Sequence, residues 1–144
     1  MVQVPQASKI CYGGKGEQQY GVFNAPKLGI VLRFILINME GGFYCSSTSV
    51  SKSIWGCLSQ PDIVVTDSSN AVLKMSRIML RNSTLTAEVN GRLLYVLFSP
   101  VTVQREQEFR IWTSESLVRT TRSNSDVTGS HCVQISMGYL STTD

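Results

Sequence analysis

The stretch Thr84-Leu-Thr-Ala-Glu-Val-Asn-Gly-Arg-Leu-Leu-Tyr-Val-Leu-Phe98 carries the strongest sign of a fold in this sequence. Asn90-Gly91 separates two runs of strand-forming residues, and both of these turn residues tolerate a positive φ. The stretch therefore predicts a β-hairpin. Because successive side chains of a strand point to opposite faces, one face of that hairpin is expected to carry Leu85, Ala87, Val89, Leu94, Val96 and Phe98. Pro100 is expected to end the second strand, because proline has no backbone N–H to donate.

Further short apolar runs, bounded by turn residues, occur along the rest of the chain, and helical periodicity is absent almost everywhere. The runs are Gly29–Ile37, Asp62–Thr66, Ala71–Met75, Glu108–Thr113 and Cys132–Tyr139. Gly29–Ile37 is almost continuously apolar, so we expect it to be a central strand. Gly41-Gly42 and Ser68–Asn70 are expected to be turns.

Two of these runs alternate clearly. In Glu108–Thr113, Phe109 and Ile111 should point inward. In Cys132–Tyr139, the inward residues should be Val133, Ile135, Met137 and Tyr139. Many short strands of this kind predict an all-β protein with an antiparallel two-sheet β-sandwich, jelly-roll-like in type.

Composition narrows the range of functions. A chain of 144 residues suits one domain, residues 1–144, and a hydrophobic fraction of 42% indicates a globular protein. The net charge of +3 is small and its basic residues are spread out. We therefore expect no nucleic-acid binding, which usually needs a dense basic stripe. No apolar run approaches the ~18 residues of a membrane span, so none is expected.

The four cysteines are Cys11, Cys45, Cys57 and Cys132, and none lies in a C-x-x-C pair. Zinc is therefore not expected, because zinc ligands usually arrive in close pairs. Four cysteines allow three pairings, of which we favour Cys45 with Cys57 and Cys11 with Cys132. Disulfides would place the protein in a secreted or extracellular setting. The N-terminal residues lack the pattern of a signal peptide. The alternative is a cytosolic domain with four reduced cysteines.

Catalytic motifs are missing from the sequence. The single histidine, His131, is followed by Cys132, and neighbouring strand residues point to opposite faces. They cannot form a local nucleophile–base pair. The sequence has no G-x-S-x-G, H-E-x-x-H or P-loop motif. We therefore expect a binding module and no enzyme.

The segment Glu108–Cys132 is the best candidate for a binding site. Arg110 and Trp112 should point away from the inward face of their strand, toward a polar loop. An indole face beside fixed polar groups suits a sugar ring, and loop oxygens suit calcium. The expected sugar-binding residues are Arg110, Trp112, Glu115, Asn124 and Asp126, and the last three are also the expected calcium ligands. The alternative is a tryptophan at the edge of the core beside a solvated loop.

The same segment resembles a pattern found in secreted domains of marine invertebrates. The matching positions are Arg110, Ile111, Trp112, Glu115, Leu117, Asp126, Gly129 and Cys132, and Phe43-Tyr-Cys45 with Ser53-Ile-Trp55-Gly-Cys57 also fits. In this respect the chain is similar to calcium-dependent galactose-binding lectins of sea anemones. The resemblance implies a secreted lectin for terminal galactose-type sugars, with a bound calcium ion as cofactor. Lectins gain avidity from multivalency, so a homo-oligomer is expected.

The sequence departs from that pattern where Thr113-Ser114, Ser116 and Val127 replace the usual residues. Fewer acidic groups predict a weaker calcium site. Two other functions remain open. One is an extracellular structural or receptor-type protein-interaction module without a sugar site. The other is an anionic-polysaccharide binder that uses Arg105, Arg110, Arg119 and Arg122.

Overall fold

The computed structural model describes residues 1–6, 8–13, 20–44, 54–55, 63–80, 91–113 and 128–141. Within these ranges the chain forms nine β-strands and no helix. The strands are β1 (Val2–Pro5), β2 (Ile10–Gly13), β3 (Gly21–Asn24), β4 (Gly29–Tyr44), β5 (Ile63–Asp67), β6 (Met75–Leu80), β7 (Arg92–Val103), β8 (Glu108–Thr113) and β9 (Thr128–Tyr139). In this part of the chain, no helix is long and apolar enough to cross a membrane.

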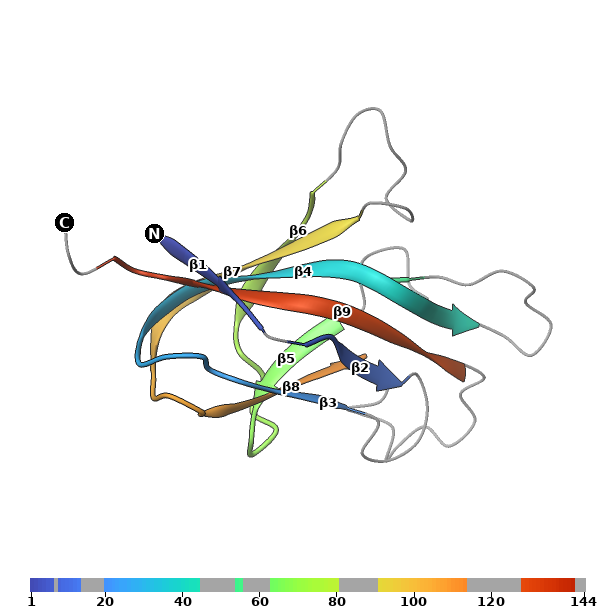
Figure 1. Ribbon diagram of the computed structural model, residues 1–144, viewed down its shortest axis with the longest axis horizontal. Helices are drawn as coiled ribbons and strands as arrows, with labels where there is room; N and C mark the ends of the chain where they lie inside the picture. The colour runs from blue at the N-terminus through green and yellow to red at the C-terminus, as the bar shows by residue number, and fades with distance from the viewer. Residues whose placement is uncertain are drawn as a thin grey trace.

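The strands form two antiparallel sheets, which confirms the predicted β-sandwich (Figure 1). The larger sheet has the order β1-β9-β4-β7-β6, and β2 also pairs with β9. The smaller sheet has the order β3-β8-β5. Because β1 meets the last part of β9 and β2 meets the first part, these two short strands lie one after the other along a single edge.

The core fills the space between the two sheets, as the alternating runs predict. The inward side chains of β9 are almost fully buried: Val133, Ile135, Met137 and Tyr139. From the smaller sheet, Phe109 stacks on Phe23 with ring centroids 5.7 Å apart, and Phe34 of β4 meets both rings edge-on. Aromatic pairs of this geometry stabilise a core beyond the area they bury.

The long strand β4 is central, with β9 on one side and β7 on the other. It continues beyond the predicted end at Ile37 and runs through Gly41-Gly42, so the predicted turn there is wrong. The register of β4 against β9 shifts between Asn38 and Glu40, and Gly41 adopts a φ of 81°. The glycines therefore provide an irregularity within a strand, which is a known alternative use of glycine in a sheet.

The predicted hairpin is wrong in its pairing. Arg92 of β7 pairs with Leu80 of β6 on one edge and with Ile37 of β4 on the other. Both edges of this part of β7 are therefore occupied by strands other than the predicted partner run, Thr84–Val89. That run and Asn90 lie outside the described residues. The core side chains of β7 are Leu93, Tyr95 and Leu97, whereas Leu94, Val96 and Phe98 alternate with them on the other face.

Pro100 does not end β7, which continues to Val103. The pairing of β7 with β4 moves from Val96 directly to Val101, so Pro100 lies in a register shift. Proline is tolerated at such a bulge because no ladder hydrogen bond is required of it. The run Ala71–Met75 is likewise no strand: Val72 forms one isolated bridge to Thr66, and β6 begins only at Met75.

The disulfide between Cys11 and Cys132 is confirmed and joins β2 to β9 at directly paired positions. It closes a sequence separation of 121 residues. In the chain-entropy account, a closure of that length stabilises the folded state by about 5 kcal/mol. The second predicted pair, Cys45 with Cys57, lies outside the described residues.

Candidate functional site

Several strands begin or end together at one end of the sandwich. Gly13 pairs with Ser130 at the end of β2, and Tyr44 pairs with Thr128 at the end of β4. In the smaller sheet, the last residue of β8 is Thr113, which pairs with the first residue of β5. Figure 1 shows these strand ends on the same side of the molecule. We call this side the Thr128 end. It is where the predicted binding segment leaves β8 and enters β9.

The structure describes two of the five predicted sugar-binding residues, Arg110 and Trp112. Glu115, Asn124 and Asp126, which are also the predicted calcium ligands, lie outside the described residues. Both described residues belong to β8 and lie on the face opposite Phe109 and Ile111. Phe109 and Ile111 belong to the hydrophobic core cluster, whereas Arg110 and Trp112 do not.

Trp112 is buried, with 5% of its surface exposed. Its indole N–H donates to the hydroxyl of Thr66 at 3.0 Å, and its ring centroid lies 4.6 Å from that of Tyr20. The expected open stacking surface is therefore covered, because Tyr20 and Thr66 pack against the indole. In this conformation Trp112 supports the outer face of the smaller sheet, as the edge-of-core alternative proposed.

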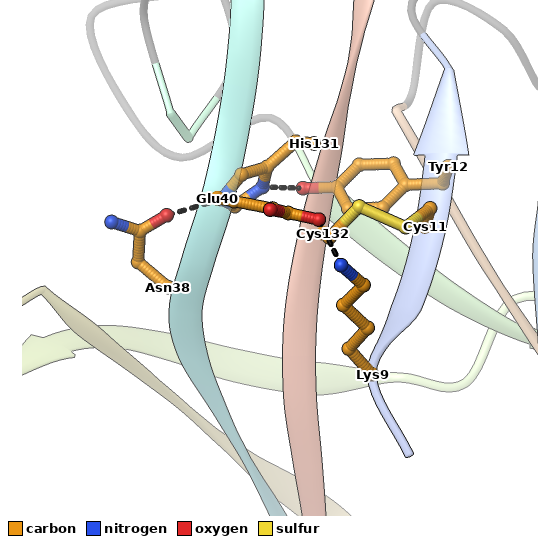
Figure 2. The surroundings of a disulfide bond; sticks show 7 residues. All are labelled: Lys9, Cys11, Tyr12, Asn38, Glu40, His131 and Cys132. Atoms are coloured by element: carbon orange, nitrogen blue, oxygen red, sulfur yellow. Dashed lines mark hydrogen bonds and ion pairs between the residues drawn. A yellow bond between two sulfur atoms is a disulfide. The ribbon is translucent and has the colours of Figure 1, made fainter.

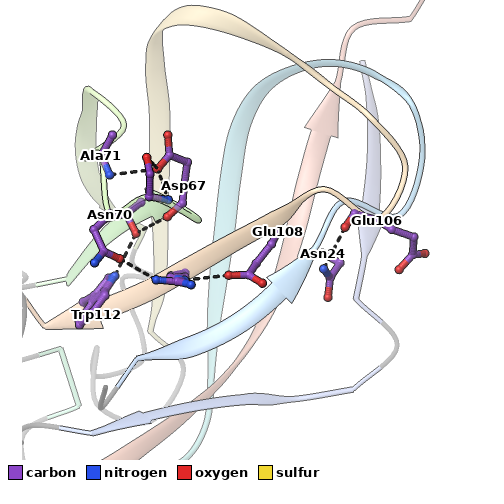
Figure 3. A network of polar contacts seen from close by, with 10 residues as sticks. Asn24, Asp67, Asn70, Ala71, Glu106, Glu108 and Trp112 are labelled. Atoms are coloured by element: carbon purple, nitrogen blue, oxygen red, sulfur yellow. Dashed lines mark hydrogen bonds and ion pairs between the residues drawn. The ribbon is translucent and has the colours of Figure 1, made fainter. Parts of the chain in front are cut away.

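Arg110 is held in place on the same face. Its Nε donates to Glu108 Oε2 at 2.8 Å, and Nη1 donates to Asn70 Oδ1 at 2.9 Å. The guanidinium carbon also lies 4.4 Å from the ring centroid of Tyr20, a cation–π contact. Figure 3 labels both hydrogen-bond partners, Glu108 and Asn70, and shows Trp112 near Asn70. Arg110 is thus a fixed cation with at least two of its donor groups already used.

The turn after β5 positions Asn70 for that contact. One carboxylate oxygen of Asp67, Oδ1, accepts from the Ser69 N–H, the Ser69 hydroxyl and the Ala71 N–H, at 2.7–3.0 Å. The Ser69 hydroxyl is the largest cause that lowers the pKa of Asp67, followed by the Ala71 N–H. Asn70 adopts a φ of 69°, which asparagine tolerates better than most residues. The predicted turn Ser68–Asn70 is therefore confirmed.

A second surface at the Thr128 end was missed by sequence reasoning. It is a cleft of about 410 Å³, and we call it the glycine cleft. Its lining residues are Glu40, Gly41, Gly42 and Tyr44 from β4, with Gly129, Ser130 and Cys132 from β9. This volume is within the roughly 300–1,000 Å³ common for small-molecule sites. The signal in the sequence was Gly41-Gly42, which predicted a turn only because a strand interior rarely contains two glycines.

Two of these glycines are required by the backbone. Gly41 and Gly129 adopt φ values of 81° and 99°, which side-chain-bearing residues rarely adopt. A Cβ on Gly129 would lie 2.6 Å from the carbonyl oxygen of Gly42, and a Cβ on Gly41 would collide with the carbonyl oxygen of Ser130. The close approach of β4 and β9 at the cleft therefore depends on glycine on both strands.

A buried polar network lies beside the cleft (Figure 2). His131 is fully buried, with Nδ1 2.8 Å from the hydroxyl of Tyr12 and Nε2 2.7 Å from Asn38 Oδ1. Burial lowers the pKa of His131 from 6.5 to about 4, so its imidazole is neutral at pH 7. A neutral imidazole carries one N–H. That proton is on Nε2 and is donated to Asn38, and the Tyr12 hydroxyl donates to Nδ1. The rings of Trp55 and His131 pack edge-on, with their centroids 5.1 Å apart.

The outer face at this position carries an ion pair and the disulfide. Lys9 Nζ pairs with Glu40, and the Cys11–Cys132 bond lies next to them in Figure 2. Glu40 is directly opposite Cys132 in the register of β4 and β9. Among the described residues, no group of three or more His, Cys, Asp or Glu side chains could hold a metal ion.

Comparisons with known proteins bear on the fold. AJLec, a lectin from the sea anemone Anthopleura japonica, has a similar structure, with a TM-score of 0.75. The match covers 96% of this chain and 98% of that chain, at 20% sequence identity. At that identity the likeness shows a shared sandwich fold over almost the full length of both chains. No family model matches the sequence. No curated protein matches it either.

Proposed function

We propose that this chain is a lectin, a protein that binds sugars without transforming them. The observation that carries the proposal is the likeness to the sea anemone lectin along almost the whole of both chains. Fold alone does not specify function, so the sequence resemblance of Arg110–Trp112 and Gly129–Cys132 to sea anemone lectins is the second support. These two segments lie on β8 and β9, the strands that end and begin at the Thr128 end.

The ligand we propose is a terminal galactose-type sugar, held with the help of a calcium ion. Glu115 follows Thr113 by two residues, and Asp126 precedes Thr128 by two. Covalent geometry therefore allows at most about 7 Å between each of them and the nearest strand end. Carboxylate and amide oxygens are the ligands that calcium prefers, and Asn124 would supply a third. The proposal therefore assigns these three ligands to the Thr128 end, where the described residues Thr113 and Thr128 lie.

The proposal includes an extracellular location and a homo-oligomeric state. The Cys11–Cys132 disulfide supports the location, because disulfides persist in oxidising compartments. A lectin with one site per chain gains avidity when several copies act together. Binding without catalysis agrees with the surroundings of His131, whose imidazole is fully buried beside a cysteine that is already oxidised.

A glycan array with and without a chelator tests this function. We expect the purified protein to bind galactose-terminated glycans, and to lose much of that binding in excess EDTA. Agglutination of red cells that lactose inhibits would show that more than one site acts together. Binding that persists in EDTA would remove calcium from the proposal and leave the lectin. An array without any bound glycan would contradict the lectin itself and favour a protein-interaction module.

A further inference from the structure

The glycine cleft exists because of the residues that line it. Gly42 and Ser130 pair across β4 and β9, and Gly41 and Gly129 flank that pair. Three of these four residues have no side chain, and Ser130 has a small one that is exposed. Among the described lining residues, the large side chains stand at the two ends of the cleft, with Glu40 toward the disulfide and Tyr44 at the last position of β4. The sheet surface is therefore hollow between a carboxylate and an aromatic ring.

The polar end of the cleft can bind hydroxyl groups. The side chain of Glu40 is 56% exposed and its partner Lys9 is 49% exposed. An exposed ion pair contributes little to stability, so exchanging part of it for ligand contacts costs little. A carboxylate accepts from two neighbouring hydroxyls, an ammonium group donates to ring or hydroxyl oxygens, and the Ser130 hydroxyl can do either.

The other end offers an aromatic surface. Glu40 and Tyr44 are four residues apart on one strand, which corresponds to about 13 Å along the sheet. This spacing is longer than one pyranose ring, so a ring between them would present hydroxyls to Glu40 and C–H groups to the tyrosine. This combination of one aromatic side chain and a few fixed polar groups is what amphipathic ligands such as sugars require.

The cleft is also held in a fixed shape. Positive φ values at Gly41 and Gly129 define its backbone, and the disulfide ties Cys132 to β2. Beneath the sheet, His131 is anchored to both β2 and β4 through Tyr12 and Asn38. A rigid site binds more tightly because little order is lost when the ligand enters.

From these features we propose that the glycine cleft is a saccharide subsite, in which Glu40, Lys9 and Ser130 bind the hydroxyls of a neutral sugar and Tyr44 packs against its apolar face. The inference rests on the proposed lectin function and names a second part of its site. The carboxylate of Glu40 is the only charged group in the described lining, and its ion pair with Lys9 balances that charge. A neutral sugar therefore fits this cleft better than a sulfated or carboxylated one.

The test compares three variants with the wild-type protein. Glu40→Gln removes the charge and keeps the shape, and Ser130→Leu fills the cleft from an exposed position. Glu106→Gln is the matched control, because Glu106 is also an exposed carboxylate in an ion pair, with Arg105. Binding of lactose, which has two sugar rings and can therefore occupy both parts of the site, is measured by calorimetry, and the melting temperature reports folding. We expect both cleft variants to lose about tenfold or more in affinity, since a charged hydrogen bond contributes about 1.5–3 kcal/mol.

The outcomes separate the two proposals. Reduced affinity in Glu40→Gln and Ser130→Leu, with Glu106→Gln unchanged, supports the subsite. If both cleft variants are folded and bind galactoside as the wild type does, the subsite is overturned and the lectin function stands. If the wild type binds no sugar on the glycan array, the lectin function fails and the subsite fails with it. Should Ser130→Leu fold poorly, Lys9→Gln with Arg105→Gln as its control gives the same comparison.

Discussion

Acid should destabilise this protein through one buried side chain, His131. In the unfolded chain its imidazole has the ordinary pKa of 6.5, whereas burial lowers the pKa to about 4 in the folded protein. Between these two pH values the unfolded state binds more protons than the folded state. The free energy of unfolding must therefore fall as the pH decreases from 6.5 to about 4.

The size of the loss follows from the difference between the two pKa values. The whole gap corresponds to about 3 kcal/mol, and about 2.5 kcal/mol of it is already lost at pH 4.5. Native proteins are stable by only about 5–15 kcal/mol, so the loss is easily measured. Urea unfolding at pH 7.5 and pH 4.5 gives the free energy at each pH. The His131→Gln variant carries a neutral amide that can replace both imidazole contacts. The difference in unfolding free energy between wild type and this variant removes the contribution of every other titrating group.

A stability difference between wild type and His131→Gln that did not depend on pH would show that folding leaves the pKa of His131 unchanged. His131 is the single histidine of the chain, so its ring signals in an NMR titration are unambiguous. That titration supplies an independent answer even if the variant folds poorly. We expect a midpoint near pH 4, and a midpoint near 6.5 would show that the imidazole is not buried in solution.

Three further outcomes are expected. Replacing both Cys11 and Cys132 with alanine should lower the free energy of unfolding by up to about 5 kcal/mol in urea titrations, because the closed loop is long. Gly129→Ala should destabilise by about 1–3 kcal/mol in thermal unfolding, since its φ of 99° and the nearby Gly42 carbonyl both exclude a Cβ. Trp112→Ala should cost about 3–5 kcal/mol of stability, as for a buried aromatic; a variant that melts like the wild type would show that Trp112 is a surface group.

Sequence reasoning succeeded where a pattern depends only on neighbours along the chain. Alternation in Cys132–Tyr139 identified the buried face of β9, and the apolar run from Gly29 identified the central strand. The Cys11–Cys132 pair is a long-range feature; it was favoured among the three possible pairings, and the structure confirms it. Both strand features reflect a local requirement, burial on one face or on both.

It failed where a long-range contact decides the outcome. Asn90-Gly91 favours a tight turn, but both edges of β7 at Arg92 are occupied by strands from elsewhere in the chain. Trp112 points to the predicted face, yet its burial depends on Tyr20 and Thr66, which are far away in sequence. The glycine cleft was missed because Gly41-Gly42 predicts a turn unless the partner strand β9 is known to continue beside it.

The shared edge of β9 has a consequence for how this protein opens. Two short strands protect one edge, and only β2 is fastened to it by a covalent bond. β1 is held by backbone hydrogen bonds and by contacts such as Gln3 to Ser136. Amide hydrogens of β9 that pair with β1 should therefore exchange with solvent through local fluctuations. Those that pair with β2 should exchange only through larger unfolding events. Each time β1 leaves, it uncovers a strand edge that a second molecule can pair with, so strand exchange is the natural route to aggregation of this sandwich.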